Sequence, residues 1–251
     1  MPEYCVVRQR AGPLVKTYST DRLRVVLRAG RREAVPYRSP AMWASSADKL
    51  ELYLALFGFT GAHYVLTYDD AHLPDSFSGV RKTLEAFIKR VRRASPQCRR
   101  YVYAIEAGHT HGRWHLHFVA DSTELPLPLV RELWRNGYVN PGGGEYPVLH
   151  PQEGYRRLAR YICKERDGAF VPLGKHKWGV ARGMRAMIPP PEVKLAQRLP
   201  AMPRSVYWAS RQAREHVDAL TGKSFGRFYR MDWIALPKQR HESNQGIISN
   251  T

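Results

Sequence analysis

Hydrophobic positions recur along the chain with the periods of helices. The segment DKLELYLALF has leucines at helical spacing and ends before Gly58, so the pattern predicts a helix that this glycine stops. A second helix is predicted over 77–93, where one apolar stripe is set against a strongly basic remainder. Further helices are predicted over 126–136 and 153–165.

Runs of β-branched and aromatic residues predict strands between these helices. HYVLTY at 63–68 is one such run. RYVYAIE at 100–106 and RWHLHFVA at 113–120 flank a turn bounded by glycines, which predicts an antiparallel hairpin. A PGGG turn precedes a short predicted strand near 146–149. The order of elements predicts an α+β fold, in which helices pack on one face of an antiparallel sheet.

The two ends of the chain carry weaker signals than its centre. Residues 1–45 are predicted to form a basic arm with one β-ribbon, and 46–200 the main domain. Residues 201–251 are predicted to hold a helix over 203–221, a late strand in SFGRFYRMDWI and a loose polar tail.

Charge points to the class of partner. Forty Lys and Arg against 22 Asp and Glu leave a net charge of +18, which indicates a polyanion such as nucleic acid. No apolar run is long enough to span a membrane, and MPEYCVVRQR lacks the apolar stretch of a secretory signal, so no membrane partner is expected. Cys5, Cys98 and Cys163 are too far apart for a disulfide framework or a cysteine zinc site. We expect a reducing cytoplasm.

Two histidines in the predicted hairpin are candidate metal ligands. His115 and His117 alternate along a strand, so their imidazoles share one face about 7 Å apart. Glu106 on the paired strand supplies a carboxylate, and three protein ligands leave positions open for a phosphate oxygen. The spacing alone does not decide between a metal site and two histidines without a ligand, because His109 and His111 have the same spacing in the turn.

The last predicted helix of the main domain carries a candidate nucleophile. Tyr161 and Lys164 lie three residues apart and therefore on one helix face, with Arg157 and Arg160 on neighbouring turns. Attack by a phenol on a phosphodiester forms a phosphotyrosine bond, which a free 3′-OH can later reverse. Tyr155 is a rival nucleophile, about 240° away around the helix, so the two tyrosines are not expected to face one site. The alternative for Tyr161 is a ring that only packs at the core edge.

Three blocks, in this order, resemble the motifs of the HUH endonucleases, and within them the rolling-circle replication initiators of small plasmids and single-stranded DNA phages. YVLTYDDAHLP at 64–74 resembles the first motif, EAGHTHGRWHLHF at 106–118 the second and YICK at 161–164 the third. The resemblance spans about 64–166, and the three blocks together are more specific than any one of them.

The resemblance implies a ferredoxin-like or RNA-recognition-motif-like sheet and an HUH endonuclease domain within the predicted main domain. It implies that Glu106, His115 and His117 bind Mg²⁺ or Mn²⁺, that Tyr161 is the nucleophile and that Lys164 assists it. Single-stranded DNA or an origin hairpin is the implied substrate, nicked through a 5′-phosphotyrosyl intermediate in a bacterial cell or a phage-infected host. Because we find no P-loop, we expect a host helicase and polymerase to act with it.

Basic side chains near these motifs are predicted to contact DNA phosphates. Arg90 and Arg93 lie on the basic helix, and Arg157 and Arg160 on the helix of the candidate nucleophile. The basic arm supplies further candidates, which are Arg22, Arg24, Arg28, Arg31 and Arg32.

Two alternatives remain open at this point. A single-strand transposase or a conjugative relaxase of the same superfamily has the same chemistry and differs in its DNA. A non-catalytic binder of single-stranded nucleic acid instead places Tyr101, Tyr103 and Phe118 as stacking residues on an open sheet, and its binding is indifferent to a chelator.

Overall fold

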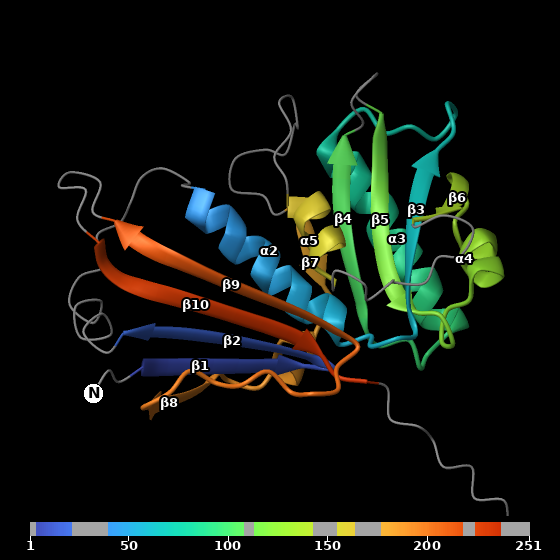
Figure 1. Ribbon diagram of the computed structural model, residues 1–251. Coiled ribbons are helices and arrows are strands. Elements are labelled where there is room, and N and C mark those ends of the chain that lie inside the picture. Colours follow the sequence, from blue (N-terminus) through green and yellow to red (C-terminus); the bar gives the residue numbers. More distant parts are fainter. Residues whose placement is uncertain are drawn as a thin grey trace, which may run out of the picture.

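Two antiparallel five-stranded sheets form the framework of the protein (Figure 1). The computed structural model describes residues 4–21, 40–107, 113–142, 155–163, 177–217 and 224–236. The predicted α+β class, with helices on a face of an antiparallel sheet, is confirmed.

The central part of the chain forms sheet B, which carries helices on one face. In order across the sheet, its strands are β6 (Gly137–Pro141), β3 (Gly61–Tyr68), β5 (Trp114–Asp121), β4 (Tyr101–Ala107) and β7 (Trp178–Val180). The helices α3 (Phe77–Ala94) and α4 (Leu127–Leu133) cover one face (Figure 1). The strands predicted over 63–68, 100–106 and 113–120 are therefore confirmed, whereas the one near 146–149 lies outside the described residues.

The apolar stripe of α3 explains how this helix seats on sheet B. Its buried residues are Phe77, Val80, Leu84, Phe87, Ile88 and Val91, the stripe that the sequence predicts. The hydroxyl of Ser76 caps the helix by accepting a hydrogen bond from the backbone N–H of Gly79 at 3.2 Å. The ring of Phe87 meets that of Phe118 on β5 edge to face, with centroids 5.1 Å apart. The basic residues of α3 consequently point away from the sheet.

The beginning and the end of the described chain together form sheet A. Its strands, in order, are β8 (Glu192–Ala196), β1 (Tyr4–Ala11), β2 (Leu14–Asp21), β10 (Ser224–Ile234) and β9 (Trp208–Val217). The β-ribbon predicted in the first 45 residues corresponds to the β1–β2 hairpin, and the predicted late strand is β10. A short 3₁₀ helix, Met184–Met187, separates β7 from β8.

The helix predicted over 203–221 is wrong, because Trp208–Val217 is the edge strand β9. Its residues ASRQAREH have ordinary helical propensity and no strong alternation of apolar and polar positions. Ten backbone pairs with β10 override that local preference, since propensity is weaker than a hydrogen-bonded ladder in a tertiary context.

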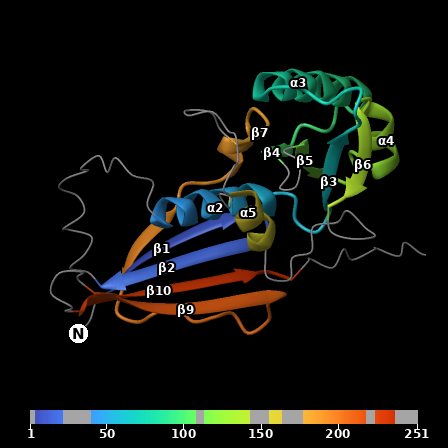
Figure 2. The same cartoon turned by 90° about the horizontal axis from the view of Figure 1, so that it is seen from above.

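Two helices lie against sheet A on the side that faces sheet B. They are α2 (Pro40–Ala55) and α5 (Arg156–Cys163), the observed counterparts of the helices predicted in DKLELYLALF and over 153–165 (Figure 2). The ring of Tyr53 on α2 contacts that of Trp178 on β7, with centroids 6.1 Å apart. These helices therefore connect the two sheets. No helix in the described part of the chain is long and apolar enough to cross a membrane.

Candidate active site

Strand alternation places three polar side chains on the face of sheet B opposite α3. His115 and His117 point to this face, whereas Phe118 points to Phe87 of α3. The register of the β4–β5 hairpin sets Glu106 directly opposite His115. The sequence prediction that these three residues share one face is confirmed.

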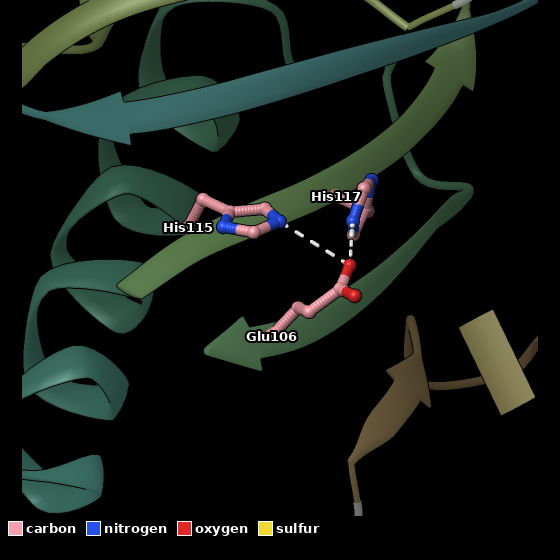
Figure 3. A group of neighbouring side chains, drawn as sticks. All are labelled: Glu106, His115 and His117. Carbon is pink, nitrogen blue, oxygen red and sulfur yellow. Dashed lines mark hydrogen bonds and ion pairs between the residues drawn. The ribbon is translucent and has the colours of Figure 1, made fainter. Parts of the chain in front are cut away.

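The three side chains converge on one point (Figure 3). The Oε2 atom of Glu106 lies 2.7 Å from Nε2 of His117 and 3.2 Å from Nε2 of His115. One ligand atom from each residue lies within 4.8 Å of the others, a spacing compatible with a shared metal ion. Glu106 and His117 are buried, while the side chain of His115 is 19% exposed, so the group opens to solvent on the His115 side.

The surroundings favour the protonation states that bind metals. Burial lowers the pKa of His117, which keeps its imidazole neutral. Burial alone would raise the pKa of Glu106, but the hydrogen bonds that it accepts from His115 and His117 outweigh burial and hold this pKa below its usual range. A neutral imidazole and an ionised carboxylate are the ligand forms that a divalent cation requires.

The donor set fits a divalent metal ion with open coordination positions. Two imidazole nitrogens and one carboxylate oxygen are too few for a closed structural site, which takes four protein ligands. The carboxylate suits Mg²⁺ or Mn²⁺, and the two nitrogens favour Mn²⁺ of this pair. The same donor set also serves Fe(II) oxygenases, so the ligands alone do not select a reaction.

Tyr161 is brought against this group by α5. Its ring meets that of His117 edge to face, with centroids 5.5 Å apart and planes at 81°, and the side chain is 38% exposed. The opposite side of the helix is buried through Ala159, Ile162 and Cys163. The structure therefore places the predicted nucleophile beside a predicted metal ligand, on the exposed side of its helix.

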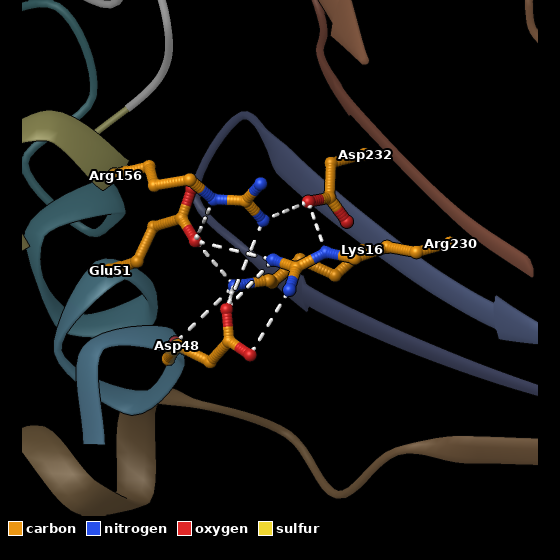
Figure 4. Close-up of polar contacts among 6 residues, drawn as sticks. All are labelled: Lys16, Asp48, Glu51, Arg156, Arg230 and Asp232. Carbon is orange, nitrogen blue, oxygen red and sulfur yellow. Dashed lines mark hydrogen bonds and ion pairs between the residues drawn. The ribbon is translucent and has the colours of Figure 1, made fainter. Parts of the chain in front are cut away.

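A buried cluster of charges holds α5 on sheet A (Figure 4). Its members are Lys16, Asp48, Glu51, Arg156, Arg230 and Asp232. Arg156 of α5 donates to Asp232 of β10 at 2.5 Å, and Arg230 of β10 donates to Asp48 of α2 at 2.7 Å. Three cations and three carboxylates balance, which is the condition under which buried charges are tolerated.

Tyr155 occupies a different environment from Tyr161. It is buried, and its hydroxyl donates a hydrogen bond to the backbone carbonyl of Gly58 at 2.8 Å. Burial raises the pKa of Tyr155, which opposes formation of a phenolate. The expectation that the two tyrosines do not share a site is confirmed.

Of the two lysines considered near the site, Lys177 belongs to the described residues and Lys164 does not. Lys164, the predicted assistant of Tyr161, lies outside the described residues. Lys177 is close enough for its charge to lower the pKa of His117, and its backbone carbonyl accepts a hydrogen bond from Ile105 of β4 at 2.8 Å. Lys177, the residue before β7, thus supplies positive charge beside the site.

The predicted DNA contacts fall into two groups on opposite sides of sheet B. Arg157 and Arg160 are exposed on α5, the helix of Tyr161. Arg90 and Arg93 lie on α3, which covers the other face, and Arg90 donates from Nε to the carbonyl of Leu133 at 2.8 Å. The predicted contacts in the basic arm lie outside the described residues; they are Arg22, Arg24, Arg28, Arg31 and Arg32.

His63 belongs to this face and was missed by sequence reasoning. Its Nε2 lies 2.9 Å from Nδ1 of His117, on the side of that ring away from Glu106. The strand HYVLTY was predicted, and its alternation sets His63 on the same face as Val65, which pairs with His117. The side of sheet B on which His63 and Val65 lie depends, however, on the register of β3 with β5. The sequence carries no signal for that register.

The stacking residues predicted for a non-catalytic binder are wrong for two of the three positions. Tyr101 and Phe118 are buried between the strands and α3, and their rings stack on each other with centroids 5.4 Å apart. Tyr103 is partly buried and packs against the same core. Tyr101, Tyr103 and Phe118 therefore do not form an exposed aromatic surface on which nucleic-acid bases could stack.

The charge cluster generates a prediction about stability. Asp232→Ala removes a carboxylate that is 1% exposed and leaves Arg156 and Arg230 buried with one partner fewer. We expect a decrease of about 3 to 5 kcal/mol in the free energy of unfolding, measured by urea titration with circular dichroism. The control Glu85→Ala breaks an exposed pair with Arg81 and is expected to change stability by less than about 1 kcal/mol. Equal effects of the two variants would contradict this account of the cluster.

A comparison with protein families gives a match to the central part of the chain. Residues 63–166 match the family model described as Replication-associated protein ORF2/G2P. The match runs from β3 through α5 and includes Glu106, both strand histidines and Tyr161. Searches among curated proteins and among solved structures found no match to the chain. The family match supports a replication-associated protein with a role in the initiation of replication.

Proposed function

We propose that this chain is a metal-dependent, site-specific DNA endonuclease and strand transferase that nicks and rejoins one strand at an origin of rolling-circle replication. The observation that carries the proposal is the contact of Tyr161 with His117, which sets a phenol beside a two-histidine, one-carboxylate group. The net charge of +18 and the family match favour a DNA phosphodiester as the substrate over the oxygen chemistry that the same ligands also serve.

The reaction exchanges one phosphodiester for another. The Oη atom of Tyr161 attacks the scissile phosphorus, a bond forms between that oxygen and the 5′-phosphate, and the bond from phosphorus to the 3′-oxygen breaks. The phenolic proton passes to solvent, and the leaving 3′-oxygen takes up a proton from it. Because the number of phosphate ester bonds is unchanged, a 3′-OH can later attack the phosphotyrosine and release Tyr161, which joins the strand.

Each part of the site has a task in this reaction. A divalent ion held by Glu106, His115 and His117 would polarise the scissile phosphate and offset its charge. Packing of α5 on α2 and sheet A orients Tyr161, so its hydroxyl does not have to be positioned anew for each reaction. Lys177 adds positive charge near the phosphate, and we assign the same task to Lys164.

The identity of the DNA separates this proposal from its neighbours. A single-strand transposase or a conjugative relaxase would perform the same exchange on an element end or a transfer origin. We favour an origin because the matched family is replication-associated. We assign the unwinding of the duplex to a host helicase and the synthesis that follows to a host polymerase, since this sequence carries no P-loop.

Metal binding is the first test. We expect isothermal titration calorimetry to show uptake of one Mn²⁺ per chain, and Mg²⁺ to bind more weakly because two ligands are nitrogens. His115→Ala should raise the Kd for Mn²⁺ by more than about 100-fold, beyond the effect of removing an outer partner. His72→Ala, which changes an exposed histidine paired with Asp69, is the control and should bind as the parent does. Absence of Mn²⁺ uptake by the parent chain would exclude this metal site.

The nucleophile is tested with a pool of random-sequence single-stranded DNA, incubated with protein and Mn²⁺ and resolved under denaturing conditions. A label at the 3′ end should remain on the protein, and a label at the 5′ end should be released, because Tyr161 retains the 5′-phosphate. Tyr161→Phe should abolish the adduct and leave DNA binding within about twofold, because only the hydroxyl is removed.

Tyr155→Phe is the matched control for the nucleophile. It removes a hydrogen bond to Gly58, which is expected to cost about 1 kcal/mol of stability, and should retain the adduct. An adduct that persists in Tyr161→Phe and disappears in Tyr155→Phe would assign the reaction to the other tyrosine.

The two groups of arginines give a prediction about the DNA path. Arg157→Ala with Arg160→Ala should reduce the slope of log K against log salt by about 0.7 for each phosphate of a single strand that the variant no longer neutralises. Arg93→Ala, on the opposite side of sheet B, should leave the slope unchanged if the strand follows α5. Fluorescence anisotropy with EDTA present measures binding without cleavage. An equal reduction of the salt slope by the α5 variant and by Arg93→Ala would show that DNA contacts both sides of sheet B.

A further inference from the structure

His63 contacts the buried ligand His117 from the neighbouring strand β3. It is 6% exposed, and its ring stacks on that of His117 with centroids 5.1 Å apart and planes at 30°. Nε2 of His63 lies 2.9 Å from Nδ1 of His117, whereas Nε2 of His117 faces Glu106 at 2.7 Å. His63 therefore engages the ring nitrogen of His117 that does not face the metal group.

Gly142 fixes the other side of the His63 ring. The imidazole is hydrogen-bonded to the backbone of Gly142, and the N–H of Gly142 donates to the carbonyl of His63 at 2.8 Å. A Cβ atom at position 142 would lie 2.0 Å from Nδ1 of His63, a distance that side chains cannot adopt. Only glycine allows this approach, so Gly142 is required for the packing of the His63 ring.

The two ring nitrogens of His117 have different partners. Nε2 faces Glu106, and without a metal ion it donates its hydrogen to that ionised carboxylate at 2.7 Å. A metal ion bound at Nε2 would require the proton of the neutral ring to lie on Nδ1. Nε2 of His63, 2.9 Å from Nδ1, is in place to accept a hydrogen bond from that N–H, and the backbone of Gly142 lies against the Nδ1 side of the His63 ring.

We propose that His63 is a positioning residue, which fixes the tautomer and the ring orientation of His117 for metal binding. The inference rests on the metal site of the proposed function and adds a residue that the spacing of the motifs does not reveal. Outer partners of this kind raise the basicity of a ligand and hold its ring, and their removal typically weakens metal binding. A histidine that only filled space in the core would not need a polar partner at either ring nitrogen.

Two substitutions separate the acceptor from the volume of the side chain. His63→Leu keeps an apolar group of similar size and removes the acceptor. His63→Gln can set its carbonyl oxygen near the place of Nε2 and accept from His117. In calorimetry of the full chain with Mn²⁺, we expect His63→Leu to raise the Kd by about 10- to 100-fold and His63→Gln by less than about fivefold.

The hydrogen bond at Nδ1 of His117 gives a readout besides affinity. In the ¹⁵N-labelled protein saturated with Mg²⁺, the Nδ1–H proton of His117 should exchange slowly with water in the parent chain and in His63→Gln. In His63→Leu it should exchange faster, because the acceptor of its hydrogen bond is gone. Circular dichroism at the same temperature shows that each variant is folded.

A third variant tests the same idea without changing either histidine. Gly142→Ala displaces the ring of His63 through its Cβ atom and should weaken Mn²⁺ binding in the same direction as His63→Leu. It also keeps the test possible if His63→Leu does not fold.

The outcomes distinguish this inference from the proposed function. An unchanged Kd in His63→Leu would overturn the role of His63 while the metal site stands. Equal weakening of Mn²⁺ binding by His63→Leu and His63→Gln, with the exchange of the Nδ1–H proton unaltered, would reduce His63 to a packing residue and also overturn the inference. Failure of the parent chain to bind Mn²⁺ would remove the proposed metal site itself.

Discussion

The pairing register of β4 and β5 is the constraint on which the site depends. It sets Glu106 opposite His115 and turns both strand histidines away from α3. Because side chains alternate along a strand, a slip of one residue would turn the imidazoles toward the aromatic core under that helix. The buried ring of Phe118 opposes such a slip, since the slip would take it out of the core under α3 and away from the ring of Phe87. The core under α3 and the candidate metal group are thus two consequences of one register.

The position of Tyr161 depends on a second constraint, the attachment of α5 to two sheets. On one side Arg156 enters the buried charge cluster of sheet A, and on the other side Tyr161 reaches His117 of sheet B. Buried ion pairs contribute little net stability, because desolvation offsets their attraction, but a pair that must be satisfied restricts the orientation of the helix that carries it. In this protein the restricted element is the one that holds the candidate nucleophile.

The sequence was sufficient for the parts of the fold and site that follow from local periodicity. Alternation along RWHLHFVA and a short hairpin were enough to bring Glu106, His115 and His117 together, and helical spacing was enough to separate Tyr161 from Tyr155. The helix expected at β9 was wrong because pairing with a distant strand decides its conformation. His63 escaped notice for the same reason, since the register of β3 against β5 is a long-range property. Local patterns therefore predicted the candidate catalytic face and not the groups that support it.

Sheet A gives the protein an order of assembly during translation. The ladder between β2 and β10 pairs Thr20 with Phe228, so an inner strand of this sheet leaves the ribosome long after the residues it must join. Until then Arg156 has no Asp232 to bind, and the helix bearing Tyr161 lacks one of its two supports. A chain released early would carry the candidate metal ligands but an unsupported phenol. Because β10 supplies Asp232, the attachment of α5 to sheet A is complete only after this strand has been synthesised.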